Sequence, residues 1–221
     1  GRPIGSNNFY GYVADGIFKT QEEVDHHPIQ NGKGIGRIRY RDLNNDGKID
    51  EDDRTWIGNP QPDFIYGLNL NLEYKNFDFT AFFQGVQNVD VVSNVKRHTD
   101  FWSVQDTYGN KGRRLLDAFD PVTNPDSDIP SVSSVDDNNE GRMSTYYVEN
   151  GSYLKLRNVQ LGYTLPKELS ERIKLSKLRL YVSGQNLWTL KSKSFTGKDP
   201  ENPNYGYPIP ITFTMGLNAS F

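Results

Sequence analysis

The fold is decided by the stretch Ile211-Thr212-Phe213-Thr214-Met215-Gly216-Leu217-Asn218-Ala219-Ser220-Phe221, in which apolar and small polar residues alternate without a break. Successive side chains of a β-strand point to opposite faces, so the stretch predicts a strand with one apolar and one polar face. Ordinary strands have about 5–6 residues, whereas a tilted strand that crosses a bilayer needs about 9–11. Taken alone, the stretch is equally consistent with a membrane-crossing strand and with a long edge strand of a soluble β-sandwich.

The composition of the 221-residue chain favours a β-rich protein whose hydrophobicity is diluted along its strands. Apolar residues make up only 35%, whereas aromatic residues reach 13%. A soluble protein this polar would have a thin core, but a membrane β-barrel alternates lipid-facing and lumen-facing residues and reads as polar overall. The chain has no cysteine, which excludes disulfides and thiolate chemistry. The sequence contains no run of about 18 apolar residues, so it predicts no transmembrane helix.

Two further alternating runs, residues 64–74 and 77–85, predict an antiparallel hairpin. Only Lys75-Asn76 separates them, which fits a two-residue turn. The turn fixes the register and makes the following residues cross-strand partners on the apolar face: Tyr74 with Phe77, Leu72 with Phe79, Leu70 with Ala81, and Leu68 with Phe83. On the other face it places Glu73 opposite Asp78. This like-charge pair should cost stability unless water or a basic neighbour lies close.

The whole chain predicts about five long strands, at residues 63–74, 77–85, 153–165, 178–190 and 211–221. The alternation shifts parity near Leu154 and Leu156, which a β-bulge or emergence above a membrane would explain. The connections over residues 86–152 and 191–210 are far longer than the usual loop of about 4–6 residues. Short turns on one side and long loops on the other are typical of outer-membrane barrels. The predicted fold class is therefore all-β, with antiparallel strands of a transmembrane barrel.

The clearest chemical motif is the acidic loop of residues 42–53. Calcium loops place oxygen ligands at positions 1, 3, 5, 7, 9 and 12, with glycine at position 6. Gly47 occupies position 6, and the predicted ligands are Asp42, Asn44, Asp46, the Lys48 carbonyl, Asp50 and Asp53. Asp53 replaces the usual glutamate, and flanking helices are not predicted. We therefore expect a structural Ca²⁺ site, with an acidic solvated turn as the alternative.

The long loop over residues 86–152 contains side chains that could contact a ligand or a partner: Trp102, Tyr108, Arg113 and Arg114. Ordinary packing explains exposed loop residues of these types at least as well. Apart from the six acidic residues and one lysine of the 42–53 loop, the chain carries a net charge of +2 with no basic cluster, so we expect no nucleic-acid binding. The sequence shows no pattern of nucleophile, general base and general acid that would predict an enzyme.

The motifs together resemble the C-terminal part of the SusC/RagA family of TonB-dependent outer-membrane receptors. The resemblance extends over nearly the whole chain and rests on Phe9-Tyr10-Gly11-Tyr12, Asp15-Gly16-Ile17-Phe18, residues 42–50 followed by Ile57-Gly58-Asn59-Pro60, Asn76-Phe77-Asp78, Phe82-Phe83-Gln84-Gly85, residues 151–158, Leu161-Gly162-Tyr163, residues 181–187 and the terminal Phe221.

The resemblance implies a role in importing oligosaccharides, or peptides, across the outer membrane. It implies a SusD-like surface lipoprotein as partner, and contact with the TonB complex through an N-terminal part that this chain does not contain. Residues 1–62 would form an extracellular region with the calcium-type loop, and residues 63–221 the barrel strands with their extracellular loops, in contact with outer-membrane lipid. Such barrels have about 22 strands, so we interpret the chain as a fragment. Phe221 resembles the terminal assembly signal of such barrels.

The alternative from a different class is a secreted, soluble β-sandwich that binds carbohydrate and is stabilised by calcium. It shares the metal loop, the aromatic residues and the strands with the barrel interpretation. It differs in predicting that the apolar faces of residues 66–74 and 77–83 pack against each other, whereas the barrel interpretation places them in lipid.

Overall fold

The computed structural model describes residues 9–101, 109–204 and 206–221. The chain divides into two compact units. The first contains Gly1–Gln61, Asp90–Asn150 and Lys193–Gly206, and the second contains Pro62–Val89, Gly151–Ser192 and Tyr207–Phe221. One boundary between the units lies between Gln61 and Pro62. Most of the two long loops, Asp90–Asn150 and Lys193–Gly206, belong to the first unit.

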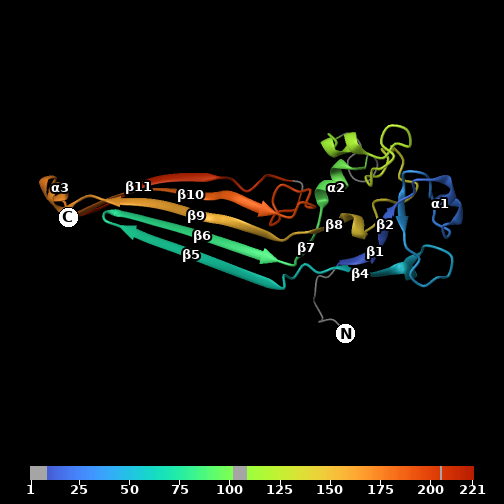
Figure 1. Cartoon of the computed structure of the whole chain (residues 1–221), viewed down its shortest axis with the longest axis horizontal. Coiled ribbons are helices and arrows are strands. Elements are labelled where there is room, and N and C mark those ends of the chain that lie inside the picture. Colours follow the sequence, from blue (N-terminus) through green and yellow to red (C-terminus); the bar gives the residue numbers. More distant parts are fainter. Residues whose placement is uncertain (1–8, 102–108, 205) are drawn as a thin grey trace. The chain divides into compact units, whose positions relative to one another are not determined.

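The second unit is a single antiparallel sheet of five long strands, seen side by side in Figure 1. The strands are β5 (Phe64–Tyr74), β6 (Phe77–Gln87), β9 (Tyr153–Thr164), β10 (Lys177–Lys191) and β11 (Thr212–Ser220). Their order in the sheet is β11-β10-β9-β6-β5. Each has 9 to 15 residues, longer than an ordinary strand. The five-strand prediction is confirmed, with bounds that differ by no more than two residues.

The register of the hairpin β5–β6 is the predicted one. Tyr74 pairs with Phe77, Leu72 with Phe79, Leu70 with Ala81 and Leu68 with Phe83. The two-residue connection explains this, because it leaves only one pairing that keeps all the apolar residues on one face. Lys75 in the turn adopts a left-handed backbone with φ of 54°.

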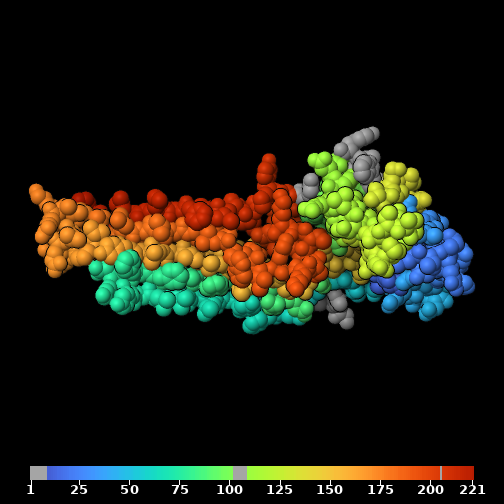
Figure 2. Space-filling view, turned by 45° about the horizontal axis from the view of Figure 1, so that its top comes forward, coloured from blue at the N-terminus to red at the C-terminus, as the bar shows by residue number. Residues whose placement is uncertain are grey.

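The two faces of the sheet have opposite character across all five strands. One row across the strands consists of Leu72, Phe79, Leu161, Val182 and Met215. The next row consists of Asn71, Thr80, Gln160, Ser183 and Thr214. Because neighbouring residues of a strand point to opposite faces, the first row lies on an apolar face and the second on a polar face. In the space-filling view, β9, β10 and β11 form one continuous surface (Figure 2).

A β-bulge explains the parity shift at the start of β9. Phe82 pairs with Asn158 but Phe83 pairs with Leu156, so Arg157 is an extra residue in the ladder. The bulge turns Leu156, and Leu154 two residues earlier, onto the apolar face that Val159 and Leu161 occupy further along. Of the two explanations that the sequence left open, the structure shows the bulge.

A short helix, α3 (Lys167–Arg172), connects β9 to β10 and begins after Pro166. Proline suits the start of a helix because its missing N–H would have no helical partner there. The helix is therefore part of a short connection, as the sequence predicts for this side of the sheet.

The first unit is built from short elements. They are β1 (Phe9–Tyr12), β2 (Ala14–Ile17), α1 (Gln21–His26), β3 (Ile38–Tyr40), η1 (Glu51–Asp53), β4 (Arg54–Gly58), β7 (Asp90–Val92), α2 (Asn94–Thr99), η2 (Arg113–Asp117), η3 (Thr145–Tyr147) and β8 (Val148–Asn150). Within the described part of this unit, the strands form three two-stranded sheets, β1–β4, β2–β3 and β7–β8. Their core is aromatic and small, consisting of Ile38, Tyr40, Phe101 and Tyr147.

Within the described residues, no helix is long and apolar enough to cross a bilayer.

Candidate functional site

The apolar face of the sheet is a candidate contact surface of the second unit. Leu72, Phe213 and Met215 expose 54%, 77% and 83% of their surface. Leaving apolar area in water costs about 25 cal/mol per Å², so a surface of this kind marks contact with lipid or with another protein. A β-sandwich would bury these side chains against a second sheet, and the structure leaves them uncovered within the described part of the chain.

The polar face carries an ion pair that spans three strands. Arg179 of β10 reaches Asp78 of β6 with two hydrogen bonds, Nε to Oδ1 at 3.0 Å and Nη2 to Oδ2 at 2.5 Å. Gly162 of the intervening strand β9 lies beneath them. A Cβ atom on Gly162 would lie 2.4 Å from both Arg179 Nη2 and Asp78 Oδ1. Glycine is therefore required here because the ion pair occupies the space where a side chain would stand.

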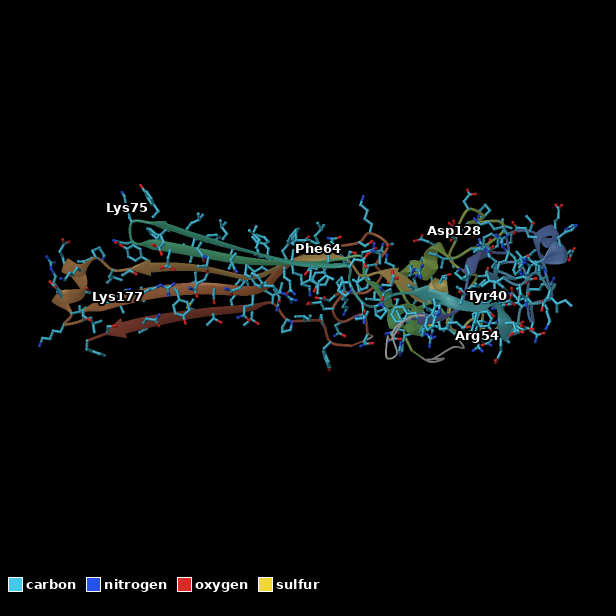
Figure 3. All side chains as sticks on the ribbon, turned by 90° about the horizontal axis from the view of Figure 1, so that it is seen from below. Tyr40, Arg54, Phe64, Lys75, Asp128 and Lys177 are labelled. Atoms are coloured by element: carbon cyan, nitrogen blue, oxygen red, sulfur yellow. The ribbon has the colours of Figure 1, made fainter. Side chains whose placement is uncertain are left out.

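This ion pair also resolves the like-charge problem that the sequence raised. Glu73 and Asp78 are direct cross-strand partners, as predicted. The guanidinium of Arg179 is the basic neighbour that pairs with Asp78, and it stacks on the Tyr181 ring with its centre 5.2 Å from the ring centroid. Lys75 and Lys177 lie at the same end of the sheet (Figure 3). They help to line a hollow of about 590 Å³ together with Glu73, Asp78, Thr80 and Arg179.

The predicted calcium loop is folded by its own side chains. Asp42 accepts hydrogen bonds from the backbone N–H groups of Asn45 and Gly47, at 2.7 and 2.9 Å. Gly47 has a φ of 86°, a conformation that favours glycine. Asp53 is fully buried and accepts from the N–H groups of Leu43 and Asp50, at 2.7 and 2.8 Å. The carboxylates at positions 1 and 12 therefore hold the turn and close the loop.

A cation already lies among the other predicted ligands. The Lys48 ammonium forms an ion pair with Asp50 and lies 3.6 Å from Asp46 Oδ2. It holds the pKa of Asp50 below its ordinary value. Among the described residues, no three His, Asp or Glu side chains are gathered closely enough to hold a metal ion. The calcium site thus stays a prediction, and binding would require Lys48 to move away.

Of the loop residues predicted to contact a ligand or partner, Arg114 lies in a polar cluster of the first unit. Its guanidinium pairs with the fully buried Asp100 side chain and lies 3.3 Å from the hydroxyl of Tyr146. That hydroxyl donates to Asp100 at 2.7 Å. Burial raises the pKa of the Asp100 carboxyl despite these partners. Arg114 therefore holds the loop together from inside.

The remaining predicted contacts are not brought together into a site. Arg113 is exposed on η2, next to Arg114. Trp102 and Tyr108 lie outside the described residues. Phe221 follows directly after β11 and exposes 97% of its surface. Its predicted role as an assembly signal stays a prediction.

Sequence reasoning missed two further buried carboxylates that form ion pairs, Glu149 and Glu140. Glu149 accepts from the backbone N–H and the hydroxyl of Thr196, at 3.0 and 2.8 Å, and pairs with Lys96 at 3.1 Å. Glu140 pairs with Arg37 at 3.0 Å, and burial raises its pKa. These carboxylates tie together loop segments that are distant in the sequence.

Over nearly the whole of its length, the chain is similar in sequence to TonB-dependent receptors. The TonB-dependent receptor P3 of Formosa agariphila is 35% identical over the full chain, and the TonB-dependent receptor SusC of Bacteroides thetaiotaomicron is 29% identical over 96% of it. These alignments cover 22% and 20% of the relatives, so the chain spans about a fifth of their length. No protein-family model matches the chain.

The fold agrees with solved structures as well. A structure of the RagAB peptide transporter superposes with a TM-score of 0.71 and 22% identity, covering 98% of this chain and 23% of the other. A structure of the RagAB peptide importer in its closed-closed state gives a TM-score of 0.70 with 23% identity, again over 98% of this chain. The five-stranded sheet thus aligns with part of a TonB-dependent receptor barrel.

The chain accordingly matches part of a TonB-dependent receptor, a class of transporters, not enzymes, that reside in the cell outer membrane. Within that class, the receptors that the chain matches in part are of the SusC/RagA type.

Proposed function

We propose that this chain forms part of the wall of an outer-membrane importer that takes up oligosaccharides or peptides in partnership with a SusD-like lipoprotein. The observation that carries the proposal is the two-faced sheet, because its strands are long enough to cross a bilayer and keep one apolar face over all five strands. The apolar face would contact lipid, and the polar face would line the lumen.

Whole-cell uptake tests this role. Cells that produce the full-length receptor are incubated with fluorescently labelled oligosaccharides and peptides, with and without a protonophore. Deleting the coding region for residues 62–89 and 151–221 should abolish the energy-dependent uptake of at least one substrate class. A matched strain that retains the region but lacks the lipoprotein gene tests the partner. Unchanged uptake of every substrate in the deletion strain, with the receptor absent from the outer membrane, would contradict the proposal.

We further propose that the loop of residues 42–53 binds a structural Ca²⁺ ion. The spacing of its oxygen-bearing residues and the glycine backbone at Gly47 support this. The ion would displace the Lys48 ammonium from Asp46 and Asp50. Lys48→Ala should therefore tighten binding in calorimetric titrations with Ca²⁺, whereas Asp46→Ala should abolish it. Absence of heat with both the unaltered chain and Lys48→Ala would exclude the site and leave the Lys48 ion pairs as the stabilising element.

A further inference from the structure

A groove of about 370 Å³ lies on the apolar face of the sheet, near the end that carries the short connections. Its walls are two neighbouring rows of that face, Phe77, Tyr163 and Leu180 in one row and Leu161, Val182 and Met215 in the next. Its floor is the backbone of the row between them, which points to the polar face and consists of Gly162, Tyr181 and Gly216. Leu180, Val182 and Met215 are all exposed, so the groove is open along this face.

Three aromatic side chains border the groove at the short-connection end of the sheet. Tyr74 pairs with Phe77, and Phe77 pairs with Tyr163 on the next strand. The ring centroids of Phe77 and Tyr163 are 4.7 Å apart, and Tyr74 is exposed. Aromatic rows of this kind are typical of the boundary between the hydrocarbon and the headgroups of a membrane. The row thus marks the level at which lipid headgroups would begin.

Basic side chains lie just beyond the aromatic row. Lys75 follows Tyr74 directly, and its ammonium lies 5.4 Å from the centroid of the Tyr74 ring. The connection through α3, at the same end of the sheet (Figure 1), adds Lys167, Arg172 and Lys174. The two connections contain only two acidic residues, Glu168 and Glu171, and all six charged side chains are exposed. This excess of positive charge attracts anionic headgroups.

The backbone does not explain why two of these residues are lysines. Lys75 and Lys174 both have a left-handed conformation, with φ of 54° and 59°. Glycine and asparagine adopt this conformation more readily than lysine does. Neither ammonium forms an ion pair with another residue in the described part of the chain. The two charges are therefore available to a ligand.

We propose that this end of the sheet binds an anionic phospholipid. One acyl chain lies in the groove, and the phosphate lies at the basic side chains of the short connections, first of all Lys75. A zwitterionic lipid would fill the groove equally well but would gain less from the lysines, because its headgroup is neutral overall. The inference rests on the proposed function, which places this face in lipid, and it adds the class of lipid and the residues that select it.

The α3 connection supports the same placement. Leu169 and Ile173 are four residues apart and lie on the same side of the helical turn. Both are about half exposed, at 47% and 53%. A short segment that combines exposed apolar side chains with basic ones is suited to the surface of an anionic membrane.

Native mass spectrometry of the full-length receptor in detergent tests the charge selection. The probe is an equimolar mixture of phosphatidylglycerol and phosphatidylcholine, both with palmitoyl and oleoyl chains. We expect preferential retention of phosphatidylglycerol, which Lys75→Asn and Lys174→Asn should each lower about fivefold. Asparagine suits the left-handed backbone at both positions, so the turns should persist. The matched control is Lys193→Asn, which removes an exposed lysine of the first unit and should change nothing.

Filling the groove tests the acyl-chain site separately. Val182→Trp places a large ring in the groove and should lower the retention of both lipids several-fold. Leu68→Trp introduces the same ring on the same face but outside the groove, and it should leave retention unchanged. Circular dichroism confirms that each variant is folded.

Three results would overturn the proposal. They are equal retention of the two lipids by the unaltered receptor, unaltered retention of phosphatidylglycerol in a folded chain with both Lys75→Asn and Lys174→Asn, or equal effects of Val182→Trp and Leu68→Trp. The proposed function can fail independently, because it is measured by substrate uptake in cells. Loss of the lipid preference with intact uptake would count against the phospholipid site alone.

Discussion

The ion pair between Arg179 and Asp78 should stabilise the sheet by connecting three strands. Arg179→Gln removes the charge but keeps a side chain of similar length. The change leaves Asp78 facing Glu73 directly across the β5–β6 hairpin without the guanidinium that offsets the charge of Asp78. We expect the variant to be less stable for two separate reasons, the lost ion pair and the restored like-charge repulsion.

The burial of the Arg179–Asp78 ion pair sets how much stability Arg179→Gln should lose. The side chains of Arg179 and Asp78 are 18% and 26% exposed, so the pair lies between a surface and a buried ion pair. Exposed pairs contribute about 0.2–1 kcal/mol, and removing one partner of a buried pair costs about 3–5 kcal/mol. We therefore expect about 1–3 kcal/mol for Arg179→Gln. Of this, about 0.2–1 kcal/mol is the cross-strand repulsion. Adding Glu73→Gln to the Arg179→Gln variant removes that repulsion and should regain this part of the stability.

A double-mutant cycle measures the coupling directly. The free energy of unfolding is determined by guanidinium titration of the receptor in detergent for Arg179→Gln, Asp78→Asn and the double variant. A coupling energy of about 1 kcal/mol or more is expected because the two residues share hydrogen bonds. Additive effects, within about 0.3–0.5 kcal/mol, would refute the view that this pair connects the strands.

Two further predictions concern a glycine and a buried carboxyl. Gly162→Ala should destabilise the sheet by about 1–3 kcal/mol in the same titration, because the new methyl would displace the ion pair above it; Gly206→Ala, with open space around it, is the control, and equal effects would contradict the argument. Burial raises the pKa of Glu140 above its ordinary value of 4.5. Its contribution to stability is thus complete below that value and is lost as the pH rises through the raised pKa. Glu140→Gln should reduce the difference in unfolding midpoint between pH 5 and pH 8, and an unchanged difference would count against this assignment.

The strands and their register were predictable because their signal is local and periodic. Alternation over nine or more residues leaves only one set of faces, and the two-residue turn at Lys75-Asn76 leaves one register. The parity shift at Leu154 and Leu156 left a bulge and emergence above the membrane open, and the register of the sheet places a bulge at Arg157.

The first unit was not predictable in the same way because its contacts join polar segments that are distant in the sequence. Gln30 donates to Asn138 at 2.6 Å across 108 positions, and Asp100 meets Tyr146 across 46. Such pairs leave no periodic pattern. For the same reason the sequence left an external contact and ordinary packing open for Arg114, and only the structure shows its ion pair with Asp100.

The central claim is that the apolar face of the sheet contacts lipid hydrocarbon. This chain has no cysteine. Once any cysteine in the rest of the receptor has been replaced, single spin labels can be placed along β11 through Phe213→Cys, Thr214→Cys, Met215→Cys and Leu217→Cys in the receptor reconstituted in bilayers. Electron paramagnetic resonance then measures collisions with dissolved oxygen, which concentrates in lipid. The prediction is high oxygen accessibility at positions 213, 215 and 217 and low accessibility at 214. Equal accessibility at all four positions, or the reverse alternation, would contradict the claim.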